Sequence, residues 1–243
     1  MDTVKIDSRQ TKMIAHRGLS GLERENTCPA FVAAANRSYF GIETDVHITS
    51  DGQFVLIHDE TTKKVTDGTH NINVETSKYS SFKDIVLPDL DGTTVRQDIR
   101  IPLLSEYVSI CKKYEKMCIL EVKNHFKKED LKRLVGIIEN MNYIESTIFI
   151  SFDLANCINL RALLPKNDIQ YITGDEKINM DLINLLCTNK LDLDIRYTLL
   201  TKDNIKLLHK YGIKVNCWTC NKKAQAEKLA KYGVDYITTN ILE

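Results

Sequence analysis

The sequence has no apolar run near the length of about 20 residues that a membrane-spanning helix needs. Its first twelve residues are polar and lack the apolar centre of a secretion signal. The 33 basic and 33 acidic residues cancel, and no long run of one sign occurs, so no overall field attracts nucleic acid or anionic lipid. We therefore expect neither a nucleic-acid partner nor stable membrane insertion. Composition says nothing about the oligomeric state.

The chain has seven cysteines, an odd number, and they are scattered along the sequence without a regular spacing. This usage indicates reduced thiols and predicts a cytoplasmic protein, with a mature secreted form as the alternative. Cys217 and Cys220 form a C-x-x-C pair between a predicted strand and helix, where a redox motif would lie. Residues three apart on a strand point to opposite faces, so we interpret the pair as structural.

The chain alternates regularly between short apolar runs and helix-like segments. The predicted strands are 12–17, 42–49, 118–123, 147–152, 169–173, 191–197, 214–220 and 235–239. Helices are predicted between them, and none after Ile241. Eight strands in 243 residues, without a glycine-rich dinucleotide fingerprint, favour one (β/α)8 TIM barrel over 1–243 rather than a doubly wound sheet. The polar N-terminal segment, or nothing, would have to cover the place of the missing last helix.

Residues 60–102 interrupt this rhythm. An Asp51-Gly52 turn first folds the second strand into a hairpin that returns over 54–58. The segment that follows is rich in Thr, Asp, Asn and Ser, and a loop of that length is either functional or folded. We predict a small insertion after strand 2, within the single domain, with a short helix near 80–85.

Polar side chains cluster where the first three predicted strands end, which is the end of a TIM barrel that carries chemistry. Glu43 and Asp45 share one face of their strand with His47, because side-chain direction repeats every two residues. Such carboxylates are either solvated or hold a cation. The other polar residues at these strand ends are His16, Arg17, His58, Glu121 and Lys123. His47 lies later on its strand, and we assign it to the hairpin rather than to a metal.

These residues fall in blocks that resemble a known family. The first blocks are Ala15-His16-Arg17-Gly18, Glu25-Asn26-Thr27, Ile42-Glu43-Thr44-Asp45-Val46, Thr49-x-Asp51-Gly52 and Leu56-Ile57-His58-Asp59. Later ones are Ile101-Pro102-x-Leu104, Glu121-Val122-Lys123, Val215-x-x-Trp218-Thr219-x-Asn221 and Gly233-Val234-Asp235-x-Ile237-Thr238-Thr239. Together they are similar to the signature of the glycerophosphodiester phosphodiesterases, within the superfamily of phospholipase C-like TIM-barrel phosphodiesterases. The block over 15–59 is the most specific, and 146–210 matches only in rhythm.

The resemblance implies a metal-dependent TIM barrel. It implies metal ligation by Glu43, Asp45 and Glu121, an acid–base pair of His16 and His58, and phosphate contacts from Arg17 and Lys123. The chain departs from the family pattern at Arg24, where a proline is usual, and at its end, where Thr-Asp-x-Pro becomes Thr239-Asn240-Ile241-Leu242.

The resemblance implies hydrolysis of a small-molecule glycerophosphodiester to glycerol 3-phosphate and an alcohol, and the residue types fit the cleavage of an anionic phosphodiester. Three carboxylates suit a hard cation, Mg²⁺ or Ca²⁺, and two histidines titrate near neutrality. The nucleophile that attacks phosphorus is either water or the substrate's own 2-hydroxyl. Trp218, the only tryptophan, either forms a wall of the substrate pocket or packs, and we favour the wall. The alternatives are a sphingomyelinase D-like lyase and a non-catalytic barrel that binds phosphoesters.

Overall fold

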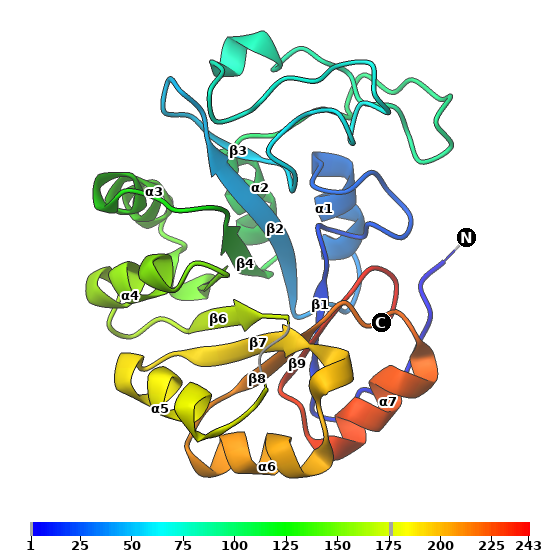
Figure 1. Cartoon of the computed structure of the whole chain (residues 1–243). Helices are drawn as coiled ribbons and strands as arrows, with labels where there is room; N and C mark the ends of the chain where they lie inside the picture. The colour runs from blue at the N-terminus through cyan, green and yellow to red at the C-terminus, as the bar shows by residue number, and fades with distance from the viewer. Residues whose placement is uncertain (1, 175–176) are drawn as a thin grey trace.

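In the computed structural model, which describes residues 2–174 and 177–243, eight parallel strands close into a barrel (Figure 1). They are β1 (Lys12–Ala15), β2 (Gly41–Ile48), β4 (Met117–Val122), β5 (Thr147–Ser151), β6 (Ile169–Thr173), β7 (Asp192–Arg196), β8 (Val215–Trp218) and β9 (Tyr236–Thr239). Each strand pairs with the next, and β9 and β2 both pair with β1, which closes the ring. The predicted (β/α)8 TIM barrel is confirmed, with every strand end within two residues of the one expected.

Helices cover the outside of the barrel (Figure 1). They are α1 (Cys28–Ala35), α2 (Leu104–Lys113), α3 (Lys128–Asn140), α4 (Leu154–Leu163), α5 (Met180–Asn189), α6 (Lys202–Lys210) and α7 (Lys223–Tyr232). Local sequence sets their ends. The Thr27 hydroxyl accepts from the Ala30 backbone N–H to begin α1, and Gly233 ends α7 at a φ of 87°. Over the described residues, no helix has the length and apolar character needed to cross a bilayer.

No helix follows β9 among the described residues, and the N-terminal segment lies beside the last residues instead. The Val4 backbone N–H donates to the Ile241 carbonyl at 3.0 Å, and that of Ile6 donates to the Glu243 carbonyl at 2.8 Å. Ile6 also packs against the main apolar core. The polar N-terminal segment therefore takes the place expected for it.

The barrel interior holds an apolar cluster. Its buried members are Ile14, Ile119, Ile148, Ile150, Ile172 and Tyr236, each contributed by a barrel strand. A larger apolar cluster fills the space between the strands and the helices. The polar residues that point inward at the C-terminal ends of the strands therefore lie above packed apolar side chains, as they do in barrels of this type.

The insertion has a small core of its own. After the antiparallel strand β3 (Phe54–Leu56), residues 60–102 pack over the end of β2 (Figure 1). The shared cluster is Val55, Ile57, Val65, Val74, Phe82, Leu87, Ile99 and Ile101. The predicted helix at 80–85 is wrong, because only one 3₁₀ turn forms, over Tyr79–Ser81. Phe82 leaves the helical region, at a φ of −140°, and buries its ring in this cluster.

Candidate active site

Three buried carboxylates meet at the C-terminal ends of β2 and β4. The parallel register pairs Asp45 with Glu121 directly, and Glu43 lies two residues earlier on β2. One oxygen from each of the three lies within 4.8 Å of the others, and all three residues are buried. This cluster is the one formed by the three predicted metal ligands.

The protonation of this cluster is shaped by burial and by mutual repulsion. Burial and then the charge of Asp45 raise the pKa of Glu43 well above its usual range, and the same two causes raise that of Glu121 to about 7. For Asp45, burial acts to raise the pKa, but the Arg17 and Lys123 charges outweigh it and the pKa falls. Three neighbouring carboxylates cannot all ionise in a dry site without further positive charge.

The donor set fits a divalent cation. All three groups are oxygen ligands, which Mg²⁺ and Ca²⁺ prefer. Asp45 Oδ1 is buried and makes no hydrogen bond among the residues that the structure describes; its nearest charged partner is Lys123 Nζ, at 3.6 Å. A buried charged oxygen without a hydrogen bond is costly unless a cation meets it more closely. The orphaned oxygen and the raised pKa of Glu43 are thus both consistent with a cation site.

Arg17 and Lys123 contact the carboxylates from either side. Arg17 Nε lies 3.3 Å from Asp45 Oδ2, and its Nη1 lies 3.0 Å from Glu25 Oε1. Lys123 Nζ lies 2.7 Å from Glu121 Oε1 and 3.6 Å from Asp45 Oδ1. Both predicted phosphate contacts therefore adjoin the cluster, where they also offset its negative charge.

A strained turn holds Arg17 in place. Arg17 has a φ of 55° and Gly18 one of 75°, a left-handed pair that is costly for a residue with a side chain. The turn aims the Arg17 backbone N–H at Glu43 Oε2, at 2.8 Å. A Cβ at Gly18 would come within 2.7 Å of Ala30. The glycine after His16-Arg17 is therefore required both by its φ and by the close approach of α1.

His16 follows β1 and faces the cluster. Its Nε2 lies 3.9 Å from Glu43 Oε2, and its Nδ1 lies 2.7 Å from Asn240 Oδ1. An amide oxygen only accepts, so we place the ring proton on Nδ1 and the lone pair on Nε2. Burial, followed by the Arg17 charge, lowers the pKa of His16 to about 4.

His58 lies across the cluster, just after β3. Its Nδ1 lies 2.6 Å from Asp59 Oδ1, and burial lowers its pKa below the usual range. His47 pairs with Val55 in the hairpin, as predicted. Its Nε2 donates to the His58 carbonyl at 3.2 Å, and its Nδ1 lies 2.7 Å from Glu75 Oε1. His47 thus holds the His58 backbone and ties the insertion to the barrel.

A cavity of about 190 Å³ opens above these groups. It is lined by His16, Arg17, Glu43, His58, Glu121, Ile150, Phe152, Ile172, Asp194, Trp218, Thr219 and Thr238. Trp218 lines it and packs edge-to-face against Phe152, at 5.7 Å between ring centroids. All eight predicted site residues therefore line this cavity or contact a residue that does.

Sequence reasoning missed Asp194, Phe152 and Asn240. The alternation of Asp192, Asp194 and Arg196 along a strand was a signal that polar side chains enter the barrel. Phe152 follows directly on β5, at the same end of the barrel as the other site residues. Asn240 stands out in the sequence only as a departure from the family pattern, and its contact with His16 depends on the pairing of β1 with β9.

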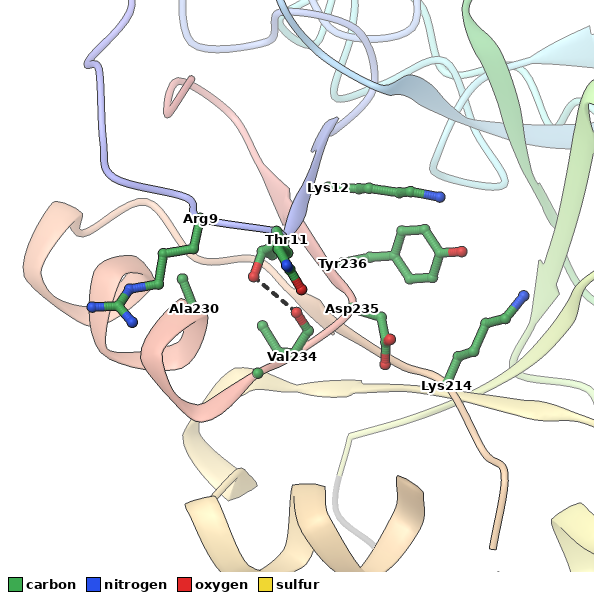
Figure 2. A pocket seen from close by; sticks show the side chains of 10 residues that line it. Arg9, Thr11, Lys12, Lys214, Ala230, Val234, Asp235 and Tyr236 are labelled. Atoms are coloured by element: carbon green, nitrogen blue, oxygen red, sulfur yellow. Dashed lines mark hydrogen bonds between the residues drawn. The ribbon is translucent and has the colours of Figure 1, made fainter. Parts of the chain in front are cut away.

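A larger hollow, of about 560 Å³, lies at the opposite end of the barrel (Figure 2). There the Thr11 hydroxyl donates to the Val234 carbonyl. Lys214 pairs with Asp168 at 2.6 Å, and Asp235 accepts from the Val215 backbone N–H. These groups are engaged with one another, which is typical of the stabilising face of such a barrel.

The cysteines match the prediction of reduced thiols. All seven are unpaired in the described part of the chain. Cys217 and Cys220 are both fully buried, and burial raises the pKa of each thiol. A raised pKa disfavours the reactive thiolate, which agrees with a structural role for the C-x-x-C pair.

Comparison with known proteins agrees with the fold. The sequence profile of the Glycerophosphoryl diester phosphodiesterase family matches residues 16–243, and the chain belongs to this family of phosphoric diester hydrolases. It is 28% identical to YhdW of Bacillus subtilis (strain 168), over 94% of this chain and 93% of the relative. It is also 28% identical to a glycerophosphodiester phosphodiesterase of Caldanaerobacter subterraneus subsp. tengcongensis, over 95% and 94%.

A solved structure has the same fold. A phosphodiesterase of Oleispira antarctica, in complex with the product sn-glycerol-3-phosphate, superposes with a TM-score of 0.85. That comparison covers 97% of this chain and 95% of the other, at 23% identity. The barrel is therefore shared over nearly the whole of both chains.

Proposed function

We propose that the chain hydrolyses glycerophosphodiesters to glycerol 3-phosphate and an alcohol in a reaction that needs a divalent cation. The observation that carries the proposal is the buried cluster of Glu43, Asp45 and Glu121, with His16 and His58 lining the same cavity. Family membership supplies the reaction class. The cluster and the histidines supply the groups that the reaction requires.

Glu43, Asp45 and Glu121 would hold the cation, Mg²⁺ or Ca²⁺. When bound, such an ion polarises the phosphoryl oxygens and offsets the charge of the transition state. Arg17 and Lys123 act with it. A phosphodiester is an anion that repels nucleophiles, and two adjacent cations lower that barrier. The guanidinium also offers paired donors that match two phosphate oxygens.

The two histidines divide the proton transfers. His16 is held as the Nδ1–H tautomer by Asn240, so its Nε2 is ready to accept a proton from the attacking oxygen. His58 donates a proton to the oxygen of the departing alcohol. The attacking oxygen forms a bond to phosphorus as the bond from phosphorus to the alcohol oxygen breaks. That attacking oxygen belongs either to water or to the substrate's 2-hydroxyl, which would first give a cyclic phosphate.

Trp218 and Phe152 form the aromatic wall of the cavity, on the side away from the carboxylates. Their paired rings offer an apolar surface to the carbon chain of the substrate. The cavity is small, at about 190 Å³. This size favours a small head group and the glycerol portion over a long acyl chain.

Release of glycerol 3-phosphate from glycerophosphocholine, glycerophosphoethanolamine and glycerophosphoglycerol tests the proposal. Each substrate is incubated with Mg²⁺, with Ca²⁺ or with EDTA, using the wild type, His16→Ala and Glu43→Ala. His70→Ala, at an exposed histidine, is the matched control. We expect cation-dependent release that both site variants lose and the control keeps.

The products also separate the alternatives. A lyase of the sphingomyelinase D type would accumulate a cyclic phosphate rather than glycerol 3-phosphate. Cation binding without turnover of any substrate would favour the non-catalytic barrel. Either result would overturn the proposed hydrolysis.

A further inference from the structure

Asp194 is a buried acid that the proposed chemistry does not use. It lies on β7, where it pairs with Ile172 of β6 and with Asn216 of β8. Its side chain is 2% exposed and lines the cavity that holds the histidines and carboxylates. Its Oδ1 has no hydrogen-bond partner among the residues that the structure describes. A buried oxygen of this kind is costly unless a ligand meets it.

The neighbouring polar groups do not supply that partner. Gln170 Oε1 accepts from Asn216 Nδ2 at 3.0 Å, and Asn216 Oδ1 accepts from the Thr238 hydroxyl at 3.2 Å. This hydrogen-bond network joins β6, β8 and β9, and neither of its bonds involves Asp194. No described residue bonds to Oδ1, so the hydrogen-bonding capacity of this oxygen is unmet although Asp194 lines the cavity.

A second orphaned group lies on the same wall. Trp218 Nε1 is buried and has no hydrogen-bond partner in the described part of the chain, and Trp218 lines the same cavity. Trp218 lies on β8, two residues beyond the Asn216 that pairs with Asp194. The cavity is therefore lined by two residues, Asp194 and Trp218, that each carry a buried polar atom without a hydrogen-bond partner among the described residues.

The opposite wall carries the charged groups, so the two sides of the cavity differ in chemistry. Glu43, Asp45, Arg17 and Lys123 lie on or beside β1, β2 and β4. Asp194 and Trp218 lie on β7 and β8, with apolar Ile150 and Ile172 also lining the cavity. Burial, and then the charge of Glu121, raise the pKa of Asp194 well above its usual range. This wall is therefore suited to an uncharged ligand that donates and accepts hydrogen bonds.

We propose that Asp194, together with the Trp218 indole N–H, binds the terminal hydroxyl of the substrate's glycerol moiety and makes the site specific for glycerol diesters. The proposal rests on the proposed function, because it takes the phosphate to lie at the carboxylate wall. The terminal hydroxyl is the glycerol group farthest from phosphorus, so it is the one that reaches across the barrel. A hydroxyl satisfies both orphaned groups, since it can accept from Nε1 and donate to Oδ1.

A double-mutant cycle between protein and substrate tests this contact. The substrates are glycerophosphocholine and propane-1,2-diol 1-phosphocholine, which keeps the 2-hydroxyl and lacks only the terminal one. Choline release gives kcat/KM for the wild type and for Asp194→Leu, whose side chain has the same branching and the same number of heavy atoms but no polar group. On glycerophosphocholine we expect a loss of about 10- to 100-fold, the effect of leaving one buried polar group unpaired. On the deoxy substrate the further loss stays within about threefold, because the contact is already absent.

Two further variants guard against a purely structural effect. Asp194→Asn keeps a donor and an acceptor and should restore most of the preference for glycerophosphocholine. Trp218→Phe keeps an aromatic ring, although a smaller one, and removes the N–H; it should show the same kind of coupling to the terminal hydroxyl, even if Asp194→Leu fails to fold. Thermal melts report folding for each variant.

The outcomes separate this inference from the proposed function. Equal losses on both substrates, in the Asp194 and the Trp218 variants alike, would overturn the hydroxyl contact while leaving the hydrolysis intact. A wild type that releases no choline from glycerophosphocholine, with any cation, would overturn the proposed function and this inference with it.

Discussion

His16 Nδ1 lies 2.7 Å from Asn240 Oδ1, so a neutral amide fixes the orientation and the tautomer of a buried histidine. The contact joins the end of β1 to the residue after β9 and therefore exists only because the barrel closes. A carboxylate at position 240 would stabilise the imidazolium form more than the amide oxygen does. Burial and the Arg17 charge lower the pKa of His16 to about 4 and keep the ring neutral, and the Asn240 contact leaves its Nε2 free to accept a proton.

The first prediction concerns the pH profile of Asn240→Asp. The new negative charge should raise the pKa of His16 by about one unit or more. Protonated His16 would then persist to higher pH, so the acid limb of kcat/KM moves upward. Asn36→Asp, at an exposed asparagine, is the control and should leave the limb in place. An unmoved limb in Asn240→Asp would mean that His16 does not act as the base.

The second prediction separates the roles of the two histidines. If His58 protonates the departing alcohol, His58→Ala should lose roughly 10²–10⁴-fold in rate on glycerophosphocholine. It should lose much less on p-nitrophenyl glycerophosphate, whose phenolate departs without a proton. His16→Ala should lose activity on both. Equal losses by His58→Ala on the two substrates would contradict its role as the acid.

The third prediction is that a bound cation stabilises the fold. A ligand that binds only the folded state adds about 2.7 kcal/mol at a hundredfold excess over its dissociation constant. Tm should therefore rise with Mg²⁺ or Ca²⁺ concentration and fall with EDTA. Glu43→Gln should reduce this dependence, and Glu129→Gln, at an exposed position, should keep it. A Tm that does not change with the concentration of either cation would contradict the assignment of the carboxylate cluster as the cation site.

The fourth prediction concerns the support beneath the cluster. The Tyr107 hydroxyl donates to the Ile42 carbonyl at 2.6 Å and accepts from the Ile119 backbone N–H at 3.0 Å. It thereby bridges β2 and β4, which carry the three carboxylates. Tyr107→Phe leaves both buried backbone groups without this partner, and we expect a loss of about 1–3 kcal/mol in the free energy of unfolding. Urea denaturation measures it, and an unchanged midpoint would refute the bridge.

Much of the fold could be predicted from the sequence because its signals are local. Alternating strand and helix patterns, the caps at Thr27 and Gly233, and the turn at Asp51-Gly52 each act within a few residues. The spacing of Glu43 and Asp45 indicated a shared strand face for the same reason. The helix predicted at 80–85 was wrong because Phe82 is drawn into the core of the insertion, a tertiary effect that local pattern does not contain.

The site could be predicted only in part, because its contacts depend on register. Asp45 faces Glu121 only through the pairing of β2 with β4, and the partner of His16 comes from the far end of the chain. Asp194 was missed because β7 lies in the region where the sequence resembles the family only in rhythm. Its importance rests on a missing hydrogen bond, which no sequence pattern reveals.

Cation dependence of turnover tests the central claim most directly. Protein stripped with EDTA and dialysed should release no glycerol 3-phosphate from glycerophosphocholine. Release should return in a saturable way as Mg²⁺ or Ca²⁺ is added, and Glu43→Gln should shift that titration to higher cation concentration. Full activity of the stripped protein in excess EDTA would contradict the account.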